Sequence, residues 1–410
     1  MKIGVVGLGY VGIVTAAALA ENKNEIVCVD IDPNKIKRLE SGDPVIYEPD
    51  LKPLLKKNLK RMTFSLDYNK LNGCEAVFLS VPTPTKNGKA DLSYVMAASK
   101  DMARIDRDVV LVVKSTVLPG TAAEFAQKTG LTIISNPEFT KEGTAVDDTL
   151  HPDRIVIGGS NKSALDLVER IWSFTGAPVI KTTNENAELI KYASNAFLAT
   201  KISFINEIAN LAEHIPGTDV EVIARGMGYD KRISPYFLKA GIGYGGSCLP
   251  KDTLAFSNFA KELGENLEIV EAAMKINDRR VEKVLSLIKK YHKNLKGKKV
   301  AVLGISFKGN TNDIRESKAI TLIHKLKQEG AQVSFYDPKV KSIDDFGMRS
   351  SADLETAIEG SDAIVVATEW DEFKNLNPVT DSVVIDAKRI LDPKKFRKFG
   401  AIGLYSDGKD

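Results

Sequence analysis

The segment Lys2-Ile-Gly-Val-Val-Gly-Leu-Gly-Tyr-Val-Gly12 opens the chain and decides its fold class. Its first half is a short apolar run, and an alanine-rich helical stretch from Val11 to Ala20 follows directly. A strand that enters a glycine-rich turn and then a helix is typical of a dinucleotide-binding βαβ unit. In such a turn Gly7 permits the tight bend, Gly9 lets the backbone approach a pyrophosphate, and Gly12 lets the helix pack closely. The segment therefore predicts a phosphate site at the N-terminus of the first helix.

An acidic residue closes the second predicted strand. Asp30 ends the run Ile26-Val-Cys-Val-Asp30, where its carboxylate can accept ribose hydroxyls and would repel a 2′-phosphate, which favours NAD over NADP. Two later loops, Val81-Pro-Thr-Pro-Thr85 and Ser115-Thr-Val117, follow predicted strands and should line the same crevice. Their hydroxyls either bind the ligand or serve only the chemistry of the turns.

The C-terminal part of the chain repeats this pattern weakly. Lys299-Val-Ala-Val-Leu-Gly-Ile-Ser-Phe-Lys-Gly309 resembles the opening segment, and Val333-Ser-Phe-Tyr-Asp337 again ends in an acid. Apolar strands that alternate with amphipathic helices at both ends predict an α/β protein with two Rossmann-like, doubly wound parallel-sheet domains. Because Ser306 replaces the middle glycine and Lys308 adds a charge, the second turn suits a different phosphate, such as a nucleotide-sugar diphosphate. The alternative is a duplicated domain kept only for packing.

The middle of the chain differs from both ends. Residues 184–214 and 254–295 lack strand signals and are expected to form long helices. We therefore expect an N-terminal NAD-binding Rossmann domain at 1–183, a helical segment at 184–297 that carries the cysteine loop, and a second Rossmann-like domain at 298–410. The long helical central segment joins the two domains and is expected to form a homodimer interface.

The composition excludes several other classes of protein. The 410 residues are 43% hydrophobic and 27% charged, which is ordinary for a globular protein and excludes a disordered or fibrous chain. With 57 basic and 54 acidic residues, the net charge of +3 indicates neither a nucleic acid nor a membrane as partner. The cysteines Cys28, Cys74 and Cys248 are sparse and lack metal-ligand spacing, so we expect no disulfide framework and no metal. No signal peptide or membrane span is apparent, which favours the cytoplasm.

One cysteine lies in a setting that suits catalysis. The run Ala240-Gly-Ile-Gly-Tyr-Gly-Gly-Ser-Cys-Leu-Pro-Lys-Asp252 combines a glycine-rich loop with a helix start that Pro250 signals. Cys248 therefore lies near the helix cap, where the helix dipole and Lys251 would stabilise a thiolate while glycines leave room for a substrate. The other two cysteines lie in or beside predicted core strands and are expected to be inert.

A helix of the central segment carries Glu188, Lys191 and Asn195 on one face, with Phe197 and Ile202 as apolar neighbours. By itself this stripe is best interpreted as a solvated edge. If the face meets the glycine loop, however, the ammonium and amide groups could stabilise an alkoxide or a thiohemiacetal oxyanion.

A loop after the predicted strand 131–135 carries two carboxylates. It reads Asn136-Pro-Glu-Phe-Thr-Lys-Glu-Gly143 and contains Glu138 and Glu142. Either could be a base that activates water, or both could be ordinary surface charge.

Taken together, three motifs resemble those of the UDP-glucose 6-dehydrogenase family. They are Gly7-Leu-Gly-Tyr-Val-Gly12, Asn136-Pro-Glu-Phe139 and Gly243-Tyr-Gly-Gly-Ser-Cys-Leu-Pro-Lys-Asp252, and the likeness covers essentially all of the chain. The resemblance implies two Rossmann-like domains bridged by a long helix that also dimerises. It also implies an NAD-dependent, four-electron oxidation of UDP-glucose to UDP-glucuronate, in which a cysteine captures the aldehyde and water later releases the acid from a thioester.

The resemblance implies a role for each catalytic residue. Cys248 matches the nucleophile, while Lys191 and Asn195 would hold the oxyanion. Asp252 and Thr116 would position the catalytic water.

The resemblance also implies binding residues. Glu138 would assist proton transfer during thioester hydrolysis, and Arg232 would reach into the sugar site of the partner subunit. The residues implied to contact the cofactor are Gly7, Gly9, Tyr10, Val11, Gly12, Asp30, Lys35, Thr83, Thr116, Glu142, Lys251 and Arg315. The residues implied to contact the UDP-sugar are Glu138, Phe139, Lys141, Glu142, Lys191, Asn195, Arg232, Phe237, Lys239, Gly245, Phe307, Lys308 and Lys388.

One departure from the family and several alternatives remain. Where the family usually carries Asp-Gly-Arg, this chain has Asp386-Ala-Lys-Arg389, so either Arg389 substitutes or the contact is altered, because Lys cannot reproduce a bidentate Arg contact. The substrate alternatives are a UDP-N-acetylhexosamine and GDP-mannose. A two-electron β-hydroxyacid dehydrogenase would explain the first domain but not Cys248. A non-catalytic NAD-binding regulator would leave the thiol and the lysine-bearing helix without purpose.

Overall fold

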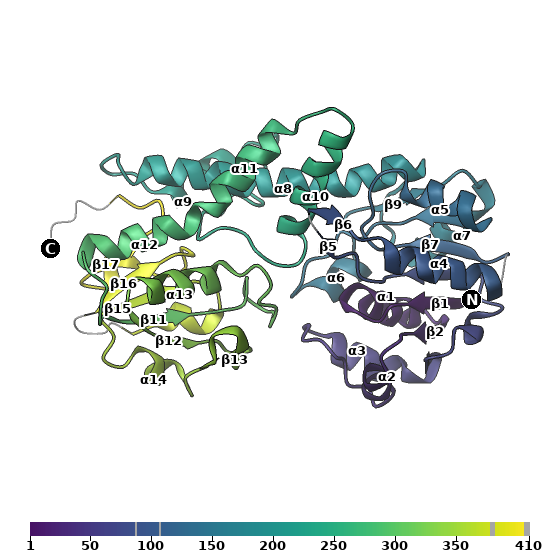
Figure 1. Ribbon diagram of the computed structural model, residues 1–410, viewed down its shortest axis with the longest axis horizontal. Coiled ribbons are helices and arrows are strands. Elements are labelled where there is room, and N and C mark those ends of the chain that lie inside the picture. The colour runs from purple at the N-terminus through teal and green to yellow at the C-terminus, as the bar shows by residue number, and fades with distance from the viewer. Residues whose placement is uncertain (87, 106–107, 378–381, 406–410) are drawn as a thin grey trace. The chain divides into compact units, whose positions relative to one another are not determined.

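A computed structural model of the chain describes residues 1–86, 88–105, 108–377 and 382–405. It divides into two units, both visible in the ribbon of Figure 1. The first unit comprises Met1–Ser194 and Leu254–Leu263. The second unit comprises Asn195–Thr253 and Gly264–Asp410. In the described part of the chain, no helix is both long enough and apolar enough to cross a membrane.

The first unit is built on an eight-stranded sheet with the order β10-β9-β8-β7-β4-β1-β2-β3. The strands are β1 Lys2–Val6, β2 Glu25–Val29, β3 Met62–Ser65, β4 Ala76–Leu79, β7 Val110–Val113, β8 Thr132–Ser135, β9 Ile155–Gly158 and β10 Val179–Thr182. Neighbouring strands pair in parallel except β8 and β9, which are antiparallel. The order of the strands reverses between β1 and β4. In such a sheet the ligand crevice lies at the carboxyl ends of the strands beside this switch point.

Both faces of this sheet are buried. The residues of β1 alternate between two hydrophobic clusters, with Ile3 and Val5 in one and Val6 in the other. Strands buried on both faces need apolar residues throughout, which explains the continuous apolar runs in the sequence. The α-helices between the strands of this sheet are α1 Tyr10–Glu21, α2 Pro33–Glu40, α3 Leu51–Asn58, α4 Ser93–Ile105, α5 Thr121–Thr129, α6 Ala145–Leu150 and α7 Lys162–Trp172. A short hairpin joins β5 Thr85–Lys86 to β6 Lys89–Ala90.

The second unit contains a five-stranded parallel sheet with the order β12-β11-β15-β16-β17. Its strands are β11 Lys299–Leu303, β12 Gln332–Tyr336, β15 Ala363–Val366, β16 Val383–Asp386 and β17 Phe399–Ala401. The remaining elements on this sheet are α13 Lys318–Gln328, α14 Leu354–Ile358 and the hairpin of β13 Ser342–Ile343 with β14 Met348–Arg349. Here too the first strand lies between the second and a later one, so the prediction of two Rossmann-like sheets is confirmed.

The central part of the chain is helical, as predicted. Helix α8 runs without a break over Asn184–Ala212, and α9 follows at Val220–Gly228. The expectation of a long helix across 254–295 was wrong. That stretch forms α10 Leu249–Glu262, α11 Glu268–Asp278 and α12 Arg280–Tyr291. Gly264, with φ +83°, follows the end of α10, because a left-handed residue cannot continue a right-handed helix.

The break between α11 and α12 places two residues that bind the glycine-rich loop of the second unit. Asn277, near the end of α11, exchanges hydrogen bonds with the backbone of Tyr244, at 2.8 and 3.0 Å. Arg280, at the start of α12, is buried and donates from Nε to the carbonyl of Gly241 at 3.0 Å. The bend therefore holds the glycine-rich loop that precedes Cys248.

Candidate active site

The three glycines of the first turn have different surroundings. Gly7 has φ +85°, and a Cβ there would lie 2.8 Å from the carbonyl oxygen of Ser80. A Cβ on Gly12 would lie 1.9 Å from the carbonyl oxygen of Gly7, so these two glycines are required by the packing of the fold. A Cβ on Gly9 would meet no described atom within 4 Å. Gly9 is the N-cap of α1 and no side chain caps it, which leaves an open cradle of N–H groups that suits a pyrophosphate.

Asp30 follows β2 and lies beside this turn. It is buried, and its Oδ2 accepts a hydrogen bond from the backbone N–H of Leu8 at 2.7 Å. The same oxygen pairs with the Lys35 ammonium at 2.7 Å, so two predicted cofactor residues are in contact. The structure thus places this acid in contact with the glycine-rich turn, at the end of β2. Thr83, another predicted cofactor residue, is buried in the loop after β4, next to the switch point.

The corresponding turn of the second unit is closed. Asp337, after β12, is fully buried, and its Oδ2 accepts bonds from the N–H of Ile305, the N–H and Oγ of Ser306, and Nε1 of Trp370. A Cβ on Gly304 would lie 2.3 Å from Thr368. Ser306 thus occupies the position of the middle glycine, and its N–H and hydroxyl groups bind the Asp337 carboxylate. This turn therefore lacks the open N–H groups of the first turn.

A buried ion pair links α8 to the loop after β8. The Lys191 ammonium lies 2.7 Å from the carbonyl oxygen of Glu138 and 3.0 Å from its Oε1. Both side chains are buried, so the interpretation of Glu138 as surface charge was wrong. Burial alone would raise the pKa of Glu138, but the Lys191 charge and two hydrogen bonds from Thr140 outweigh it and lower the pKa. The Lys191 ammonium also lies 5.4 Å from the ring centre of Phe139.

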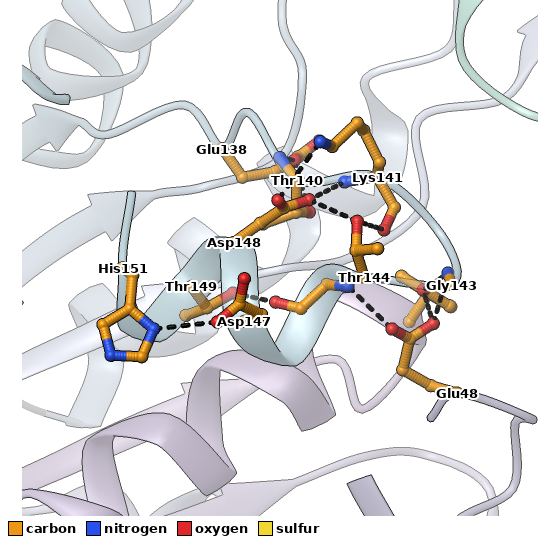
Figure 2. Close-up of polar contacts among 12 residues, drawn as sticks. Glu48, Glu138, Thr140, Lys141, Gly143, Thr144, Asp147, Asp148, Thr149 and His151 are labelled. Carbon is orange, nitrogen blue, oxygen red and sulfur yellow. Dashed lines mark hydrogen bonds and ion pairs between the residues drawn. The ribbon is translucent and has the colours of Figure 1, made fainter. Parts of the chain in front are cut away.

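The loop that carries Lys141 and Glu142 is fixed at the start of α6 (Figure 2). The N–H and ammonium groups of Lys141 both contact the Asp148 carboxylate, at 2.9 and 3.3 Å. Glu142 is half-buried, and its charge contributes to a raised pKa of Tyr10, whose largest cause is burial. The Tyr10 hydroxyl donates to Glu48, so the glycine turn and this loop share one carboxylate.

Glu48 is a functional candidate that the sequence analysis missed. Its carboxylate is buried and accepts the N–H groups of Gly143 and Ala145, each at 2.7 Å. It thereby caps the N-terminus of α6, as Figure 2 shows. The two partners lie 95 and 97 residues further along the chain, so no local pattern signals this contact.

The polar residues in the first half of α8 are buried rather than solvated. Glu188, Lys191 and Asn195 are only 3%, 4% and 7% exposed, so the solvated-edge interpretation was wrong. Phe197, which we expected beside them, is 65% exposed and therefore lies on another face. A small cavity in the first unit is lined by Val113, Ser115, Thr116, Val117, Ser135, Pro137, Glu188 and Lys191. The structure thus brings Thr116 and Lys191, both predicted catalytic residues, to one cavity.

Cys248 lies at the cap of α10, as predicted. It is exposed, whereas Cys28 and Cys74 are buried, and burial raises the pKa of the Cys28 thiol. The carbonyl of Cys248 accepts the first helical bond, from the N–H of Asp252 at 2.8 Å. The side chain of Cys248 therefore projects from the N-terminal end of the helix, where positive potential favours a thiolate.

Asp252 organises the residues around this helix start. It is 1% exposed, and its Oδ2 accepts the amide N–H of Asn195 at 2.7 Å. Its Oδ1 pairs with the Lys251 ammonium at 2.6 Å. The charge of Lys251 is therefore balanced first by Asp252, and the helix N-terminus is the main support for a thiolate. Asn195 and Asp252, two predicted catalytic residues, are in direct contact.

The glycines before Cys248 pack against the chain itself. A Cβ on Gly245 would lie 2.3 Å from the carbonyl oxygen of Glu316, and one on Gly246 would lie 2.7 Å from the Phe307 ring. The N–H of Gly246 donates to the carbonyl of Arg315 at 2.9 Å. We expected these glycines to leave room for a substrate, but at these two positions they leave room for the 307–316 segment.

Several predicted substrate residues lie elsewhere in the second unit. Arg232 is highly exposed and pairs with Asp230, and Lys239 is also exposed. Phe237 adopts a left-handed backbone with φ +62°. The Lys308 ammonium lies 5.9 Å from the ring centre of Phe307.

The departure at Lys388 and Arg389 has a structural explanation. Nη2 of Arg389 contacts both carboxylate oxygens of Asp219 at 2.8 Å, and Nη1 donates to the carbonyl of Ile402 at 3.0 Å. Arg389 is therefore held within the second unit by Asp219 and Ile402. The Lys388 ammonium pairs with half-buried Glu369 at 2.8 Å. Burial by itself would raise the pKa of Glu369, but the Lys388 charge, the hydrogen bond from Lys388 and further favourable contacts together lower it.

Comparison with known proteins covers most of the chain. Models of the UDP-glucose/GDP-mannose dehydrogenase family match in three stretches: the NAD binding domain at residues 1–175, the central domain at 185–279 and the UDP binding domain at 301–393. The UDP-glucose 6-dehydrogenase TuaD of Bacillus subtilis is 40% identical over 424 residues, with 98% of this chain and 92% of that protein covered.

Two solved structures are also similar over nearly the whole chain. A UDP-glucose dehydrogenase from Pyrobaculum islandicum is 34% identical, with a TM-score of 0.94 and 98% of each chain covered. A UDP-D-ManNAc dehydrogenase from Pyrococcus horikoshii is 29% identical, with a TM-score of 0.89, 98% of this chain and 99% of that chain covered.

Proposed function

This chain belongs to the UDP-glucose/GDP-mannose dehydrogenase family, and we propose that it oxidises the primary alcohol of UDP-glucose to the carboxylate of UDP-glucuronate with NAD as oxidant. The observation that carries the four-electron reaction is the exposed Cys248 at the cap of α10. Glucose is the sugar we favour, because the relative at 40% identity is a UDP-glucose 6-dehydrogenase and the UDP-D-ManNAc enzyme is only 29% identical.

The first unit fits a nicotinamide dinucleotide, and we propose NAD rather than NADP. Gly9 opens the turn where a pyrophosphate would lie, and Asp30 presents a carboxylate at the end of β2. That carboxylate would repel a 2′-phosphate. When bound, the dinucleotide supplies the two-electron oxidising power for each step at the sugar carbon.

Cys248 joins the two oxidations. After the alcohol has become an aldehyde, the Sγ thiolate adds to the carbonyl carbon and forms a thiohemiacetal. A second two-electron oxidation converts this adduct to a thioester. Water then breaks the C–S bond, which releases the carboxylate and restores the thiol. In total, one alcohol, one water and two oxidised cofactors yield one carboxylate, two reduced cofactors and three protons.

The polar groups along α8 have complementary roles in this scheme. Lys191 is positioned by the ionised Glu138, and its ammonium would stabilise the alkoxide and the thiohemiacetal oxyanion. Asn195 would donate to the same oxyanion, and Asp252 anchors its amide at 2.7 Å. Thr116 and Asp252 would orient the water that attacks the thioester.

The second unit would hold the nucleotide diphosphate, because its 301–393 segment matches the UDP binding domain of the family. Lys308 and Lys388 are the cations proposed for this role, with Lys388 acting as a point charge in place of the family's arginine. Phe307, beside Lys308, offers an aromatic surface to the nucleotide or sugar.

We also propose that the protein is a homodimer in which α8 forms the interface. Phe197, Phe204 and Leu211 recur every seven residues along this helix and are 65%, 46% and 58% exposed. Large apolar side chains repeated on one helical stripe are typical of a helix–helix interface. Sedimentation equilibrium checks the mass in solution. A cytoplasmic location, with its reducing conditions, would keep the Cys248 thiol reactive.

The proposed function can be tested by measuring product formation in the wild type and in variants of Cys248. Purified protein is incubated with NAD or NADP and with UDP-glucose, UDP-N-acetylhexosamines or GDP-mannose, and the reduced cofactor formed per sugar is counted. We expect two NADH and one uronate from UDP-glucose. Cys248→Ala should form no uronate while still binding both ligands, and Cys248→Ser should accumulate a protein-bound sugar ester detectable by mass. Cys74→Ala, which removes a buried thiol, is the control. Uronate formation by Cys248→Ala at a near wild-type rate would exclude covalent catalysis at this residue.

A further inference from the structure

The small cavity of the first unit combines two ionisable groups from successive turns of α8. Glu188 and Lys191 both line it, together with Thr116 and Ser135. The space that the centre of a water molecule can occupy in this cavity is about 10 Å³. A volume of roughly 10–15 Å³ is the least that one ordered water needs. Most of the exposed wall is apolar, so the hydrogen-bond partners of such a water must come from the polar side chains among the lining residues. The cavity is therefore of the size of a single water.

Glu188 is a buried carboxyl group whose hydrogen-bond donors carry no charge. Its Oε2 accepts the N–H of Gly120 at 2.7 Å, and its Oε1 accepts the N–H of Ala122 at 3.0 Å and the hydroxyl of Ser135 at 2.9 Å. All three donors are neutral. Burial raises the pKa of Glu188 to about 7, although these hydrogen bonds act in the opposite direction. At neutral pH the side chain can therefore both accept and release a proton.

We propose that Glu188 is a positioning residue that takes, through one water in this cavity, the proton that Lys191 passes on in each oxidation. The inference rests on the proposed function, in which each oxidation releases the O–H proton of the alcohol or of the thiohemiacetal. Lys191 gives one ammonium proton to the water, and the water gives one of its own to the Glu188 carboxylate. The neutral Lys191 then takes the O–H proton and is again an ammonium, while the cofactor accepts the hydride. Glu188 returns its proton to solvent.

The charged groups around the cavity are consistent with this transfer. On α8, exposed Glu185 lies one turn before Glu188, and its charge contributes to the raised pKa. From the loop after β8, Glu138 pairs with Lys191 and holds it as an ammonium at rest. From the end of β7, Lys114 adds a second buried ammonium, and the charge of Lys191 contributes to its lowered pKa.

The fourth packed element contributes no charge to the cavity. Helix α5 presents backbone N–H groups to Glu188, and its first charged side chain, Glu124, is exposed and paired with Lys128. Glu188 also caps α5 through these N–H groups. The carboxylate therefore combines a structural contact with a position from which it can exchange protons, and an amide could keep only part of the first, because Gly120 and Ala122 donate to different oxygens.

The substitution Glu188→Gln removes the proton acceptor with the least change of shape, because an amide takes up no proton. Its one oxygen can accept only one of the two α5 N–H groups, which bind different carboxylate oxygens in the wild type. We expect kcat of the wild type to rise with pH through about 7, as Glu188 becomes an ionised acceptor. In Glu188→Gln this limb should disappear and kcat should fall on the order of 100-fold, the lower end for a positioned proton acceptor. The KM values for UDP-glucose and NAD should stay within about twofold. Glu185→Gln, which removes an exposed carboxylate one turn away, is the matched control. It should keep the rising limb, moved to lower pH because the Glu185 charge contributes to the raised pKa of Glu188.

A second measurement needs no turnover. The infrared C=O band of a protonated carboxyl group should disappear from the wild type between about pH 6 and 8, be absent from Glu188→Gln and persist in Glu185→Gln. If this band is missing from the wild type, or if Glu188→Gln keeps the wild-type pH profile, the relay is wrong even in an active enzyme. A wild type that oxidises no nucleotide sugar contradicts the proposed function instead. If Glu188→Gln fails to fold, the wild-type band compared with that of Glu185→Gln decides.

Discussion

Lys114 provides a test of how burial sets the energy of a charge in this protein. It follows β7, is 7% exposed, and its ammonium has two long contacts to Asn136, at 3.3 Å to Oδ1 and 3.5 Å to the carbonyl oxygen. It also lies 4.8 Å from the ring centre of Trp172. Burial lowers the pKa of Lys114 from 10.5 to about 8. We predict that Lys114→Met, which keeps the shape and removes the charge, stabilises the first unit at pH 7.

The expected magnitude follows from this pKa. A fall from 10.5 to about 8 corresponds to roughly 3 kcal/mol, at about 1.4 kcal/mol for each pKa unit. Against this, the substitution removes two weak hydrogen bonds and one cation–π contact, together worth about 1–2 kcal/mol. Asn136 Oδ1 still accepts the Nε1 hydrogen bond of Trp172 at 3.0 Å, while the Asn136 carbonyl oxygen loses its long contact at 3.5 Å. The net gain at pH 7 is therefore about 1–2 kcal/mol.

The gain should depend on pH. Because the folded pKa lies below the unfolded one, the unfolded wild type binds more protons between pH 8 and 10.5, and the free energy of unfolding rises with pH in that window. The full cost of the charge is present below pH 8 and vanishes above 10.5. The advantage of Lys114→Met should therefore shrink across this window.

The assay is urea unfolding at pH 7 and at about pH 10, followed by the fluorescence of Trp172. A Trp370→Phe background removes the second tryptophan, so the signal reports the first unit alone. Lys128→Met is the matched control, because it removes an exposed lysine and should change stability by less than about 0.5 kcal/mol. The reasoning is refuted if Lys114→Met is less stable than the wild type at pH 7, or if the difference between the two is the same at both pH values.

Two further predictions concern the first turn and Lys191. Gly9→Ala should leave the melting temperature of the first unit nearly unchanged but weaken NAD binding at least about tenfold, whereas Gly12→Ala, whose Cβ would lie 1.9 Å from the Gly7 carbonyl, should lower stability by about 1–3 kcal/mol or more. Calorimetric titration and thermal melts separate these effects, and equal NAD affinity in Gly9→Ala would exclude the open cradle. Lys191→Ala should lower kcat by on the order of 100-fold or more while sugar affinity changes far less, since its charge acts on the developing oxyanion and Glu138 only orients it. Steady-state kinetics with direct UDP-glucose binding decide, and a defect confined to binding would contradict this role.

The features that were predictable from the sequence depend on short-range relations. Strand, turn and helix follow one another within about a dozen residues in the first glycine cluster, so its geometry was readable before any tertiary contact was known. The same holds for Cys248, because a helix cap is defined by the next few residues. The alternation of apolar strands with amphipathic helices likewise predicted two Rossmann-like sheets.

Other features were decided by contacts between distant parts of the chain. Glu188, Lys191 and Asn195 looked like a solvated stripe, yet α5, β8 and the loop after β8 cover the first two, and Asp252 binds the third. The sequence could not reveal this, because a polar helical face is the same pattern whether water or another element meets it.

Glu48 is the clearest example of a contact that the sequence could not reveal. Its partners lie 95 and 97 residues away, and only the folded sheet brings α6 to its carboxylate. The closure of the second turn around Asp337 and the packing of Gly245 on Glu316 are further cases. Periodicity and turn chemistry are local and determine which elements form. Burial, pairing and proton affinity depend on which elements meet, and only the tertiary structure decides that.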